Sequence, residues 1–304
     1  MPFVYLYEKM ADKQLAADVQ KLTEEFKREE EATNITKLTE REDDYGKTAR
    51  YLAADLEDAI NNREMFLLYQ PQVKGDEVCI GAETLVRWKH SIAGFIYPPL
   101  IVQLAKEKNL LHNLEELILD EAVGAAAVIQ RKISSEFKIS INITNHSLEW
   151  DGFEECLDRC AKKHGIAYEK IWLEITEQDA LSSSNAIMDK LQRMKAKGYK
   201  LLIDDFGMGH TSLLYLQTNY FDVVKLDGSL TRDVLENERD RGIIDSIVHL
   251  GKSLNFTTIA EYVETKEQKD KLQSLGCDVF QGYLYSKPIA LEELITWMKQ
   301  QNGR

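Results

Sequence analysis

The chain has 304 residues, of which 44% are hydrophobic, and its formal net charge is -13. This length exceeds that of a small module and fits one large barrel, commonly about 250 residues, plus an appendage. The acidic balance excludes a DNA-binding protein that relies on a basic surface, although it permits an anionic ligand held through metal ions. We therefore expect a large globular domain that does not bind DNA.

Targeting and redox signals are absent from the sequence. No basic segment followed by an apolar stretch begins the chain, and nowhere do about 18 apolar residues run together. We expect a cytoplasmic location without membrane contact by this segment, although a longer parent protein could carry a membrane tether. Cys79, Cys156, Cys160 and Cys277 form no CxxC pair, so we expect reduced packing thiols rather than a zinc site.

Residues 1–50 predict a helical linker, and residues 51–304 predict a barrel domain. In the linker, one helical stripe is formed by Leu15, Val19, Leu22 and Phe26. Its neighbours are mostly charged, so we expect an exposed or partner-seeking helix, with a short coiled-coil contact as an alternative. The charged runs Lys27 to Glu31 and Glu40 to Asp44 indicate a solvated connector.

Beyond Tyr51, short apolar runs alternate with amphipathic segments. The predicted strands are Phe66 to Val73, Val78 to Trp88, Phe137 to Thr144, Ile171 to Glu177, Lys200 to Asp205, Val223 to Asp227, Thr257 to Val263 and Val279 to Ser286. The predicted helices are Asn113 to Arg131, Leu148 to His164, Ser184 to Lys197, Glu238 to Leu254, Glu267 to Leu275 and Leu291 to Gln301. This alternation indicates a parallel sheet covered by helices.

The first two predicted strands are joined by Lys74 to Glu77, which is too short for a helical crossover. They should form an antiparallel hairpin, and the remaining strands then run parallel. Eight strands with a helix after most of them favour a closed α/β barrel of the TIM type with one antiparallel strand. No GxGxxG motif follows an early strand, which disfavours an open nucleotide-binding sheet.

Asp204 and Asp205 close an apolar strand and precede a loop bracketed by glycines. Neighbouring residues on a strand point to opposite faces, so both carboxylates reach one place only where the strand ends. A hard cation such as Mg2+ or Mn2+ prefers oxygen ligands of this kind. Taken alone, the pair is equally compatible with turn chemistry, in which Asp205 caps the turn and Asp204 pairs with a lysine.

Other predicted strands also carry polar residues near their carboxyl ends, the edge at which barrel sites lie. These residues are Glu83, Asn142, Glu174, Glu177, Lys225, Asp227, Glu261, Glu264 and Gln281. An ionisable group inside an apolar strand is costly to bury unless it is paired or metal-bound. A whole set at equivalent strand ends is difficult to explain by structure alone, so we expect a functional site.

The residue types in this set indicate the chemistry. Carboxylates and one amide, without His or Cys, favour Mg2+, Mn2+ or Ca2+ over zinc or copper. Two such cations could activate a water and stabilise the leaving oxygen of a phosphodiester. Lys225 would orient the nucleophile or neutralise developing charge, or it is a structural lysine paired with Asp204 or Asp227. Glu261 could accept the water's proton or bind metal, and the sequence leaves both roles open.

Residues near the second strand offer further candidates. Arg87 suits bidentate phosphate contact or a surface ion pair. Trp88 and Tyr69 could stack on a base, although packing is the commoner use of such residues. His90 and His210 show no ligand spacing, so we assign them no role.

Assembled in order, these motifs resemble the EAL domain, the family of cyclic di-GMP phosphodiesterases, from about Leu56 to Trp297. The matching motifs are Tyr69-Gln70-Pro71, Gly81-Ala82-Glu83-Thr84-Leu85-Val86-Arg87-Trp88, Ile141-Asn142-Ile143-Thr144, Leu173-Glu174-Ile175-Thr176-Glu177, Asp204-Asp205-Phe206-Gly207-Met208-Gly209, Val224-Lys225-Leu226-Asp227, Ala260-Glu261-Tyr262-Val263-Glu264-Thr265 and Gln281-Gly282-Tyr283-Leu284. The resemblance implies a barrel that hydrolyses cyclic di-GMP to linear pGpG with two Mg2+ or Mn2+ ions per site. It also implies that Ca2+ inhibits the reaction.

The same resemblance implies a role for each matching residue. The metal ligands would be Glu83, Asn142, Glu174, Asp204 and Asp205. The catalytic residues would be Glu83, Lys225 and Glu261, the last two handling the water. Gln70, Arg87, Asp227 and Gln281 would bind substrate, while Glu177 and Glu264 would stabilise loops. A homodimer through the loop after Asp205 and the adjacent helix is also implied.

The chain departs from the family pattern in two places. Thr84 replaces the name-giving alanine and leaves Glu83 in place. In the loop after Asp205, the chain has Met208, His210 and Thr211 where the family usually has Thr, Tyr and Ser. We expect this altered loop, rather than the metal-ligand set, to change the basal rate. Residues Phe3 to Met10 weakly resemble the end of a GGDEF domain, so the linker could be the remnant of one; a plain capping helix is the alternative.

Two other functions remain as alternatives. An EAL domain can bind cyclic di-GMP or a protein partner without hydrolysing the dinucleotide, but such domains usually lack several ligand residues and this chain lacks none. An unrelated Mg2+ barrel of the enolase type needs a large amino-terminal capping domain, for which residues 1–50 are too short.

Overall fold

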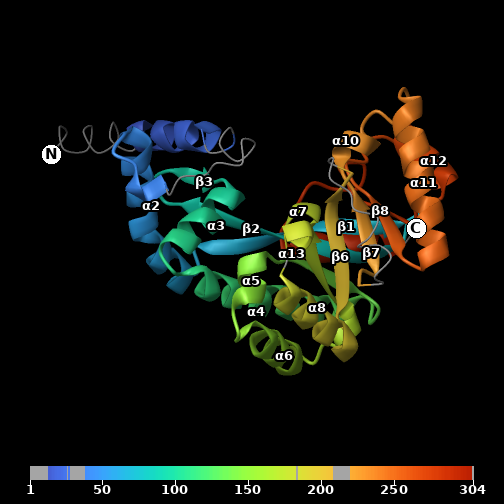
Figure 1. The fold of residues 1–304 in the computed structure, drawn as a ribbon, viewed down its shortest axis with the longest axis horizontal. Helices are drawn as coiled ribbons and strands as arrows, with labels where there is room; N and C mark the ends of the chain where they lie inside the picture. The colour runs from blue at the N-terminus through green and yellow to red at the C-terminus, as the bar shows by residue number, and fades with distance from the viewer. Residues whose placement is uncertain (1–12, 26, 28–37, 183, 208–219, 303–304) are drawn as a thin grey trace. The chain divides into compact units, whose positions relative to one another are not determined.

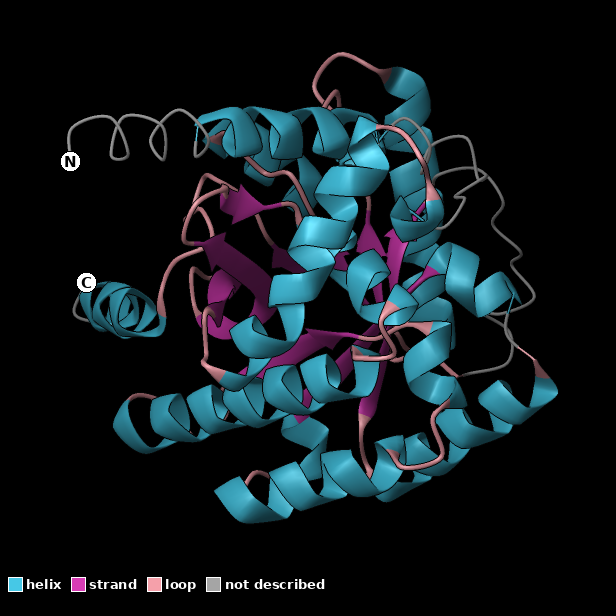
Figure 2. Ribbon diagram, turned by 90° about the vertical axis from the view of Figure 1, so that its left-hand side faces the viewer, coloured by secondary structure: helices cyan, strands magenta, loops and turns pink. Residues whose placement is uncertain are grey.

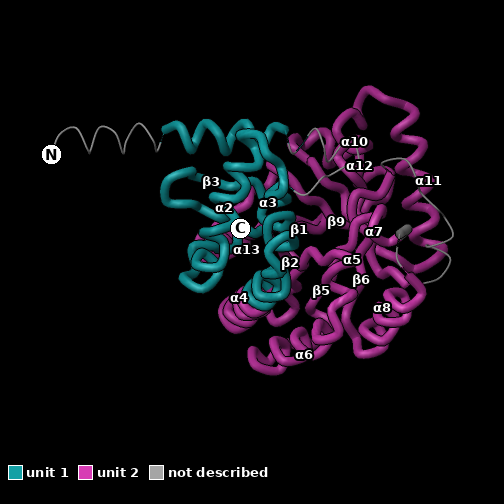
Figure 3. The backbone as a smooth tube through the Cα atoms, turned by 60° about the vertical axis from the view of Figure 1, so that its left-hand side comes forward, with its two compact units in different colours: residues 1–67, 86–118 teal, residues 68–85, 119–304 magenta. Residues whose placement is uncertain are grey.

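The computed structural model describes residues 13–25, 27, 38–182, 184–207 and 220–302. The predictions for Phe3 to Met10, for most of the run after Lys27 and for the loop with Met208, His210 and Thr211 fall outside these residues. The chain divides into two compact units (Figure 3). Unit 1 comprises Met1–Leu67 and Val86–Ile118, and unit 2 comprises Leu68–Leu85 and Leu119–Arg304.

The strands, drawn as arrows in Figure 1, pair into one sheet that closes on itself. They are β1 (Met65–Lys74), β2 (Cys79–His90), β3 (Gly94–Ile96), β4 (Lys138–Asn142), β5 (Ile171–Thr176), β6 (Lys200–Phe206), β7 (Val223–Leu226), β8 (Thr257–Ala260) and β9 (Val279–Phe280). Their order is β1-β9-β8-β7-β6-β5-β4-β2-β3, and the additional pairing of β1 with β2 closes the barrel. Within the barrel β1 runs antiparallel to β9, whereas β2 and β4 to β9 pair in parallel. The predicted TIM-like barrel with one antiparallel strand is confirmed.

Helices lie outside the strands (Figure 2). They are η1 (Leu38–Glu40), α2 (Asp44–Asn61), α3 (Pro98–Glu107), α4 (Leu111–Lys132), α5 (Asn145–Glu149), α6 (Phe153–His164), η2 (Tyr168–Lys170), α7 (Glu177–Ser182), α8 (Asn185–Lys197), α10 (Gly228–Thr231), α11 (Glu238–Leu254), α12 (Lys266–Leu275) and α13 (Leu291–Asn302), preceded by a helix over residues 13–25. The predicted helix Leu148 to His164 is two helices. Gly152 separates them, packed so closely on Trp150 that a Cβ there would lie 2.8 Å from the indole.

Five strands, β4, β5, β7, β8 and β9, end earlier than predicted, and the ends of β8 and β9 matter most for the site. β8 stops at Ala260 and β9 at Phe280, so Glu261 and Gln281 lie directly after the strand ends. Just beyond them the backbone turns through positive φ, +54° at Tyr262 and +157° at Gly282. The turns are held by Val263 N–H donating to Gln281 O at 3.1 Å and Leu284 N–H donating to Val263 O at 2.9 Å.

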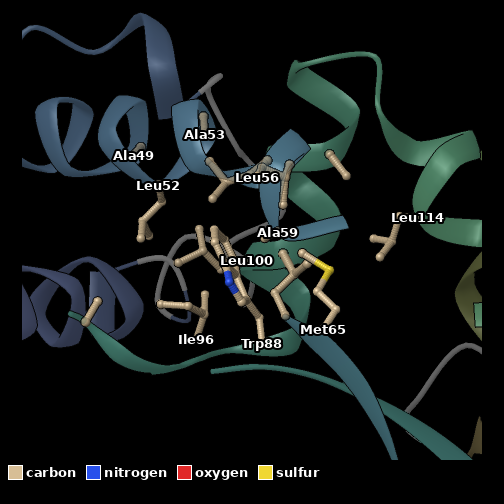
Figure 4. Packing of buried hydrophobic residues seen from close by; sticks show 14 of the residues in the cluster. Ala49, Leu52, Ala53, Leu56, Ala59, Met65, Trp88, Ile96, Leu100 and Leu114 are labelled. Carbon is tan, nitrogen blue, oxygen red and sulfur yellow. The ribbon is translucent and has the colours of Figure 1, made fainter. Parts of the chain in front are cut away.

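Unit 1 has its own apolar core, to which α2 and α3 contribute most of the buried side chains (Figure 4). Asp43 caps α2 by accepting a hydrogen bond from Gly46 N–H, and Leu52 and Leu56 on the helix are fully buried. Trp88 is also fully buried in this cluster, which confirms the packing alternative for that residue and argues against base stacking. Tyr69, in unit 2, is only 4% exposed and likewise packs.

The helix over residues 13–25 belongs to the core of unit 1. Val19 and Leu22 are buried in the cluster, and Leu15 packs against it. Arg41 adds an ion pair to Glu25 at 2.9 Å. Of the two alternatives that the sequence offered, an exposed or a partner-seeking helix, the second agrees with this burial, and the partner lies within unit 1. The predicted domain boundary at residue 50 lies inside α2 and stays a prediction.

No helix among the described residues is both long and apolar enough to span a membrane. The four cysteines are free and buried, as expected for packing thiols. His90 is buried on β2, where its Nε2 lies 3.0 Å from Asp55 Oδ2 and its Nδ1 accepts from Ala93 N–H. It therefore holds the β2–β3 turn.

Burial of the 13–25 helix can be tested by comparing Leu22→Ala with Lys21→Ala. Leu22 is fully buried, so its truncation should lower the free energy of unfolding by about 2–5 kcal/mol. Lys21 is exposed on the same helix, and its substitution should change stability by less than about 0.5 kcal/mol. Urea unfolding followed by circular dichroism measures both. Equal midpoints would show that the helix does not pack in solution.

Candidate metal centre and active site

Lys225 occupies the centre of the polar cluster in unit 2. It extends from β7, is 1% exposed and directs its ammonium at four carboxylates. Its Nζ lies 3.3 Å from Glu83 Oε2, 2.9 Å from Glu174 Oε2, 2.9 Å from Asp204 Oδ1 and 2.8 Å from Glu261 Oε1. The parallel registry of β4 to β8 brings these strand ends to one edge. The structure thus brings Lys225 together with four of the predicted carboxylates.

The backbone at Asp205 explains how adjacent aspartates serve one site. Asp205 has φ of +55°, in the left-handed region, and the pairing of β6 with β7 shifts register between Ile203 and Phe206. Such irregularities re-aim side chains at strand ends. Carboxylate oxygens of Asp204, Asp205 and Glu261 lie within 4.8 Å of one another, as do those of Glu83, Glu174 and Asp204. Asp204 therefore belongs to both groups.

A chain of amides lies beneath the carboxylates. Gln281 donates from Nε2 to Glu83 Oε2 at 2.6 Å, and its Oε1 accepts from Gln72 Nε2 at 3.2 Å. Gln72 Oε1 in turn accepts from Ser140 Oγ at 3.4 Å. Asn142 donates from Nδ2 to Glu83 Oε1 at 2.9 Å. Both oxygens of Glu83 are therefore hydrogen-bonded, and Asn142 still has its carbonyl oxygen to offer a metal ion.

The donor set fits a hard divalent cation. Carboxylate and amide oxygens are the ligands that Mg2+, Mn2+ and Ca2+ prefer. Glu174 Oε1 provides a second indication, because it is fully buried and has no hydrogen-bond partner among the described residues. A buried carboxylate oxygen without a partner is costly unless a cation compensates it.

Burial and crowding set the protonation of the cluster without metal. Burial raises the pKa of Glu174 to about 8, with Glu83 and Asp204 adding to the effect against Lys225. Burial also raises the pKa of Asp205 to about 6, reinforced by Asp204, and raises the pKa of Glu261 well above its usual value. For Glu83 the opposing attractions of Lys225, Asn142 and Gln281 outweigh burial and hold the pKa below its usual value.

Lys225 stays charged in this environment. Burial alone would lower the pKa of its ammonium, but Asp204, Glu174, Glu261 and Glu83 raise it well above the usual value. Of the two structural pairings considered for this lysine, the one with Asp204 is present. Asp227 instead uses Oδ1 to cap α10, accepting from Ser229 N–H at 2.8 Å.

The remaining predicted residues lie around this centre or in unit 1. Glu177 accepts from Gly207 N–H at 3.2 Å, which ties α7 to the turn after β6. Gln70 accepts from Gln281 Nε2 at 3.2 Å, and both line a pocket of about 160 Å³ together with Glu261 and Glu264. Arg87 falls in unit 1, and its role in substrate binding stays a prediction.

Sequence reasoning missed Gln72, Ser140 and Thr231. Thr231 donates from Oγ1 to the carbonyl of Glu261 and so fixes the backbone of that residue. Gln72 carried a readable signal, because it is two residues after Gln70 and residues at that spacing share one face of a strand. Ser140 could have been found by the same spacing from Asn142. Thr231 offered no comparable signal.

The fold and the site together define an α/β barrel whose strand ends carry a centre suited to divalent cations. Comparison with known proteins identifies its family. The family model described as EAL domain matches residues 53–288. The chain belongs to the EAL domain family.

Relatives and solved structures agree with this assignment. The chain is 32% identical over 245 residues to the bifunctional diguanylate cyclase/cyclic di-GMP phosphodiesterase MucR of Pseudomonas aeruginosa, covering 80% of this chain and 36% of that protein. It is 30% identical to the probable cyclic di-GMP phosphodiesterase PdeN of Escherichia coli, covering 80% and 47%. The MucR phosphodiesterase in complex with c-di-GMP superposes with a TM-score of 0.74 at 32% identity, covering 80% of this chain and 99% of that one. The chain thus spans less than half of these full-length relatives.

The charge balance around Lys225 can be tested with Lys225→Met. Without metal, this change leaves buried carboxylates uncompensated and should cost about 3–5 kcal/mol of stability. Mn2+ would then supply the missing positive charge, so it should raise the Tm of Lys225→Met by more than it raises that of the wild type. Thermal unfolding in chelator and in Mn2+ measures this difference.

Lys190→Met is the matched control for Lys225→Met. Lys190 is 7% exposed and donates to Trp150 O, outside the carboxylate cluster. This control should lose stability and yet show the same Tm increase with Mn2+ as the wild type. A Lys225→Met protein whose Mn2+ response equals that of Lys190→Met would contradict the proposed balance.

Metal affinity should tighten as the pH rises from 6 to 8. Carboxyls with pKa values of about 6 at Asp205 and about 8 at Glu174 must lose their protons before they bind a cation, and the deprotonated fraction grows with pH. The Kd for Mg2+ should fall by about tenfold or more across this range. Calorimetric titration measures it. Glu174→Gln should flatten the upper part of the curve, and a flat wild-type curve would argue against these protonation states.

Proposed function

We propose that this domain is a metal-dependent phosphodiesterase that hydrolyses cyclic di-GMP to linear pGpG. The observation that carries the proposal is the convergence of Glu83, Glu174, Asp204 and Glu261 on Lys225, with one oxygen of Glu174 buried and unpartnered among the described residues. Similarity to phosphodiesterases named for cyclic di-GMP supplies the substrate. The chain retains every metal-ligand position that the family resemblance implies.

Glu83, Asn142, Glu174, Asp204 and Asp205 would hold two divalent cations, Mg2+ or Mn2+. When bound, the cations would supply an activated water and neutralise charge on the phosphodiester oxygens. The chain's own residues prepare the centre for them. Asn142 and Gln281 keep Glu83 ionised and oriented, while the left-handed turn at Asp205 keeps two carboxylates on one side.

Lys225 and Glu261 would handle the proton and the charge of the reaction. The permanently charged ammonium of Lys225 would orient the attacking oxygen and stabilise negative charge on the phosphoryl group. Glu261 lies 2.8 Å from that ammonium and binds a proton more readily than a free glutamate does. It is therefore suited to accept the proton of the attacking water.

Other residues of the domain would bind the substrate and stabilise loops. Gln70, Arg87, Asp227 and Gln281 would contact the substrate, while Glu177 and Glu264 would stabilise the loops beside the centre. The domain would extend over residues 51–304, act in the cytoplasm and form a homodimer through the loop after Asp205 and the adjacent helix. Ca2+ would occupy the site without supporting turnover, because it tolerates looser coordination than Mg2+ does.

The deciding experiment is a metal-dependent turnover assay with separated nucleotide products. Purified protein with Mg2+ or Mn2+ should convert cyclic di-GMP to pGpG, and Glu83→Gln should lower kcat by at least about 100-fold because it removes a charged ligand without changing its shape. Glu169→Gln, at an exposed position on η2, should keep full activity.

Two results would overturn the enzymatic proposal. One is the absence of turnover at every metal concentration by a folded protein. The other is tight binding of cyclic di-GMP that survives chelator and gives no product, which would identify the domain as a sensor or interaction module.

A further inference from the structure

Tyr262 stands out as a strained and exposed residue directly beside the centre. Its φ of +54° lies in the left-handed region, which residues other than Gly, Asn and Asp rarely adopt. Its neighbours are nonetheless held in place, Glu261 by the hydrogen bond from Thr231 and Val263 by the hydrogen bond to Gln281 O. Strain that the surroundings enforce in this way clusters at functional sites.

The aromatic side chain of Tyr262 lines a pocket. Tyr262 is 50% exposed and lines the pocket of about 160 Å³ that also includes Gln70, Glu261 and Gln281. Whole-ligand pockets are typically about 300–1,000 Å³. A pocket of this size therefore accommodates one part of a dinucleotide, such as a single base.

One side of the ring is occupied by α10. A Cβ at Gly228 would lie 2.3 Å from Tyr262 Cδ2, and the guanidinium carbon of Arg232 lies 5.0 Å from the ring centroid. Gly228 and Arg232 are four residues apart, so they share a face of the helix and contact the ring from one side. Half of Tyr262 remains exposed, so α10 leaves part of its surface uncovered. Arg232 also restrains the ring through a cation–π contact.

We propose that Tyr262 is a substrate-binding residue whose exposed ring face stacks on one nucleobase of the substrate. This inference rests on the proposed function. Aromatic rings bind planar bases through stacking, and a ring that is already fixed on its other face loses little freedom on binding. The strain at Tyr262 places the ring beside Glu261 and thereby sets the distance between the bound base and the reacting centre.

Steady-state kinetics on cyclic di-GMP with Mn2+ test this role. Tyr262→Ala should raise KM by about tenfold or more, the effect of losing one base–aromatic stack, with kcat changed by less than about twofold. Tyr262→Phe should restore the wild-type KM because it keeps the ring. Tyr262→Gly should match Tyr262→Ala in KM, since it relieves the backbone strain and yet lacks the ring.

Two controls separate stacking from a structural effect. The Kd for Mn2+ should stay unchanged in all three variants, because stacking does not involve the metal ligands. Tyr51→Ala, at a tyrosine that is 42% exposed and does not line the pocket, should have wild-type kinetics.

A fluorescence measurement tests stacking directly. It uses a cyclic dinucleotide that carries 2-aminopurine and is bound with Ca2+. The wild type and Tyr262→Phe should quench its fluorescence more than Tyr262→Ala does.

Each outcome decides one question. A wild-type KM in Tyr262→Ala alongside normal turnover would overturn the inference and leave the proposed function intact. A joint fall of kcat and Mn2+ affinity in Tyr262→Ala would also overturn it, because it would show that the residue acts by holding Glu261. A wild-type protein that neither binds nor hydrolyses cyclic di-GMP would overturn the proposed function, and the inference with it.

Discussion

The ammonium of Lys225 forms ion pairs with four buried carboxylates, and the polar interior of the barrel depends on these ion pairs. Closing a sheet brings the ends of its parallel strands to one edge, so carboxylates from β2, β5, β6 and the turn after β8 must converge there. Without a positive charge they would repel one another in a site that excludes water. Lys225 supplies this charge from within the protein. Burial nonetheless raises the pKa of Glu174, and Glu83 and Asp204 add to this effect against Lys225.

The barrel and most of its site could be predicted from the sequence because both depend on alternation along the chain. Apolar strands interrupted by a polar residue near the carboxyl end gave Glu83, Asn142, Glu174 and Lys225. Their mutual distances could not be read in the same way, since these depend on sheet closure. The family resemblance named the same residues, and the geometry independently shows why they belong together.

What escaped prediction has physical reasons. The sequence left open whether the helix over residues 13–25 is exposed or packed, because its apolar stripe is narrow and the other residues of its cluster, in α2 and α3, lie far along the chain. Gln72 and Ser140 looked like ordinary strand residues because their partners come from different strands. Tyr262 was passed over because a positive φ at a tyrosine follows from the turns around it rather than from its own preference. In each case a contact between distant segments decided the outcome.

The amide chain beneath the carboxylates has a direction. Ser140 donates to Gln72, Gln72 donates to Gln281, and Gln281 donates to Glu83. An amide has a donor end and an acceptor end, so reversing one member would oppose two donors or two acceptors at the next contact. The carboxylate of Glu83 can only accept, so it orients Gln281, and Gln281 in turn orients Gln72 at the next depth in the barrel. The hydroxyl of Ser140 can donate or accept and completes the chain. Substitutions at that depth could change the charge state of the centre while leaving every ligand in place.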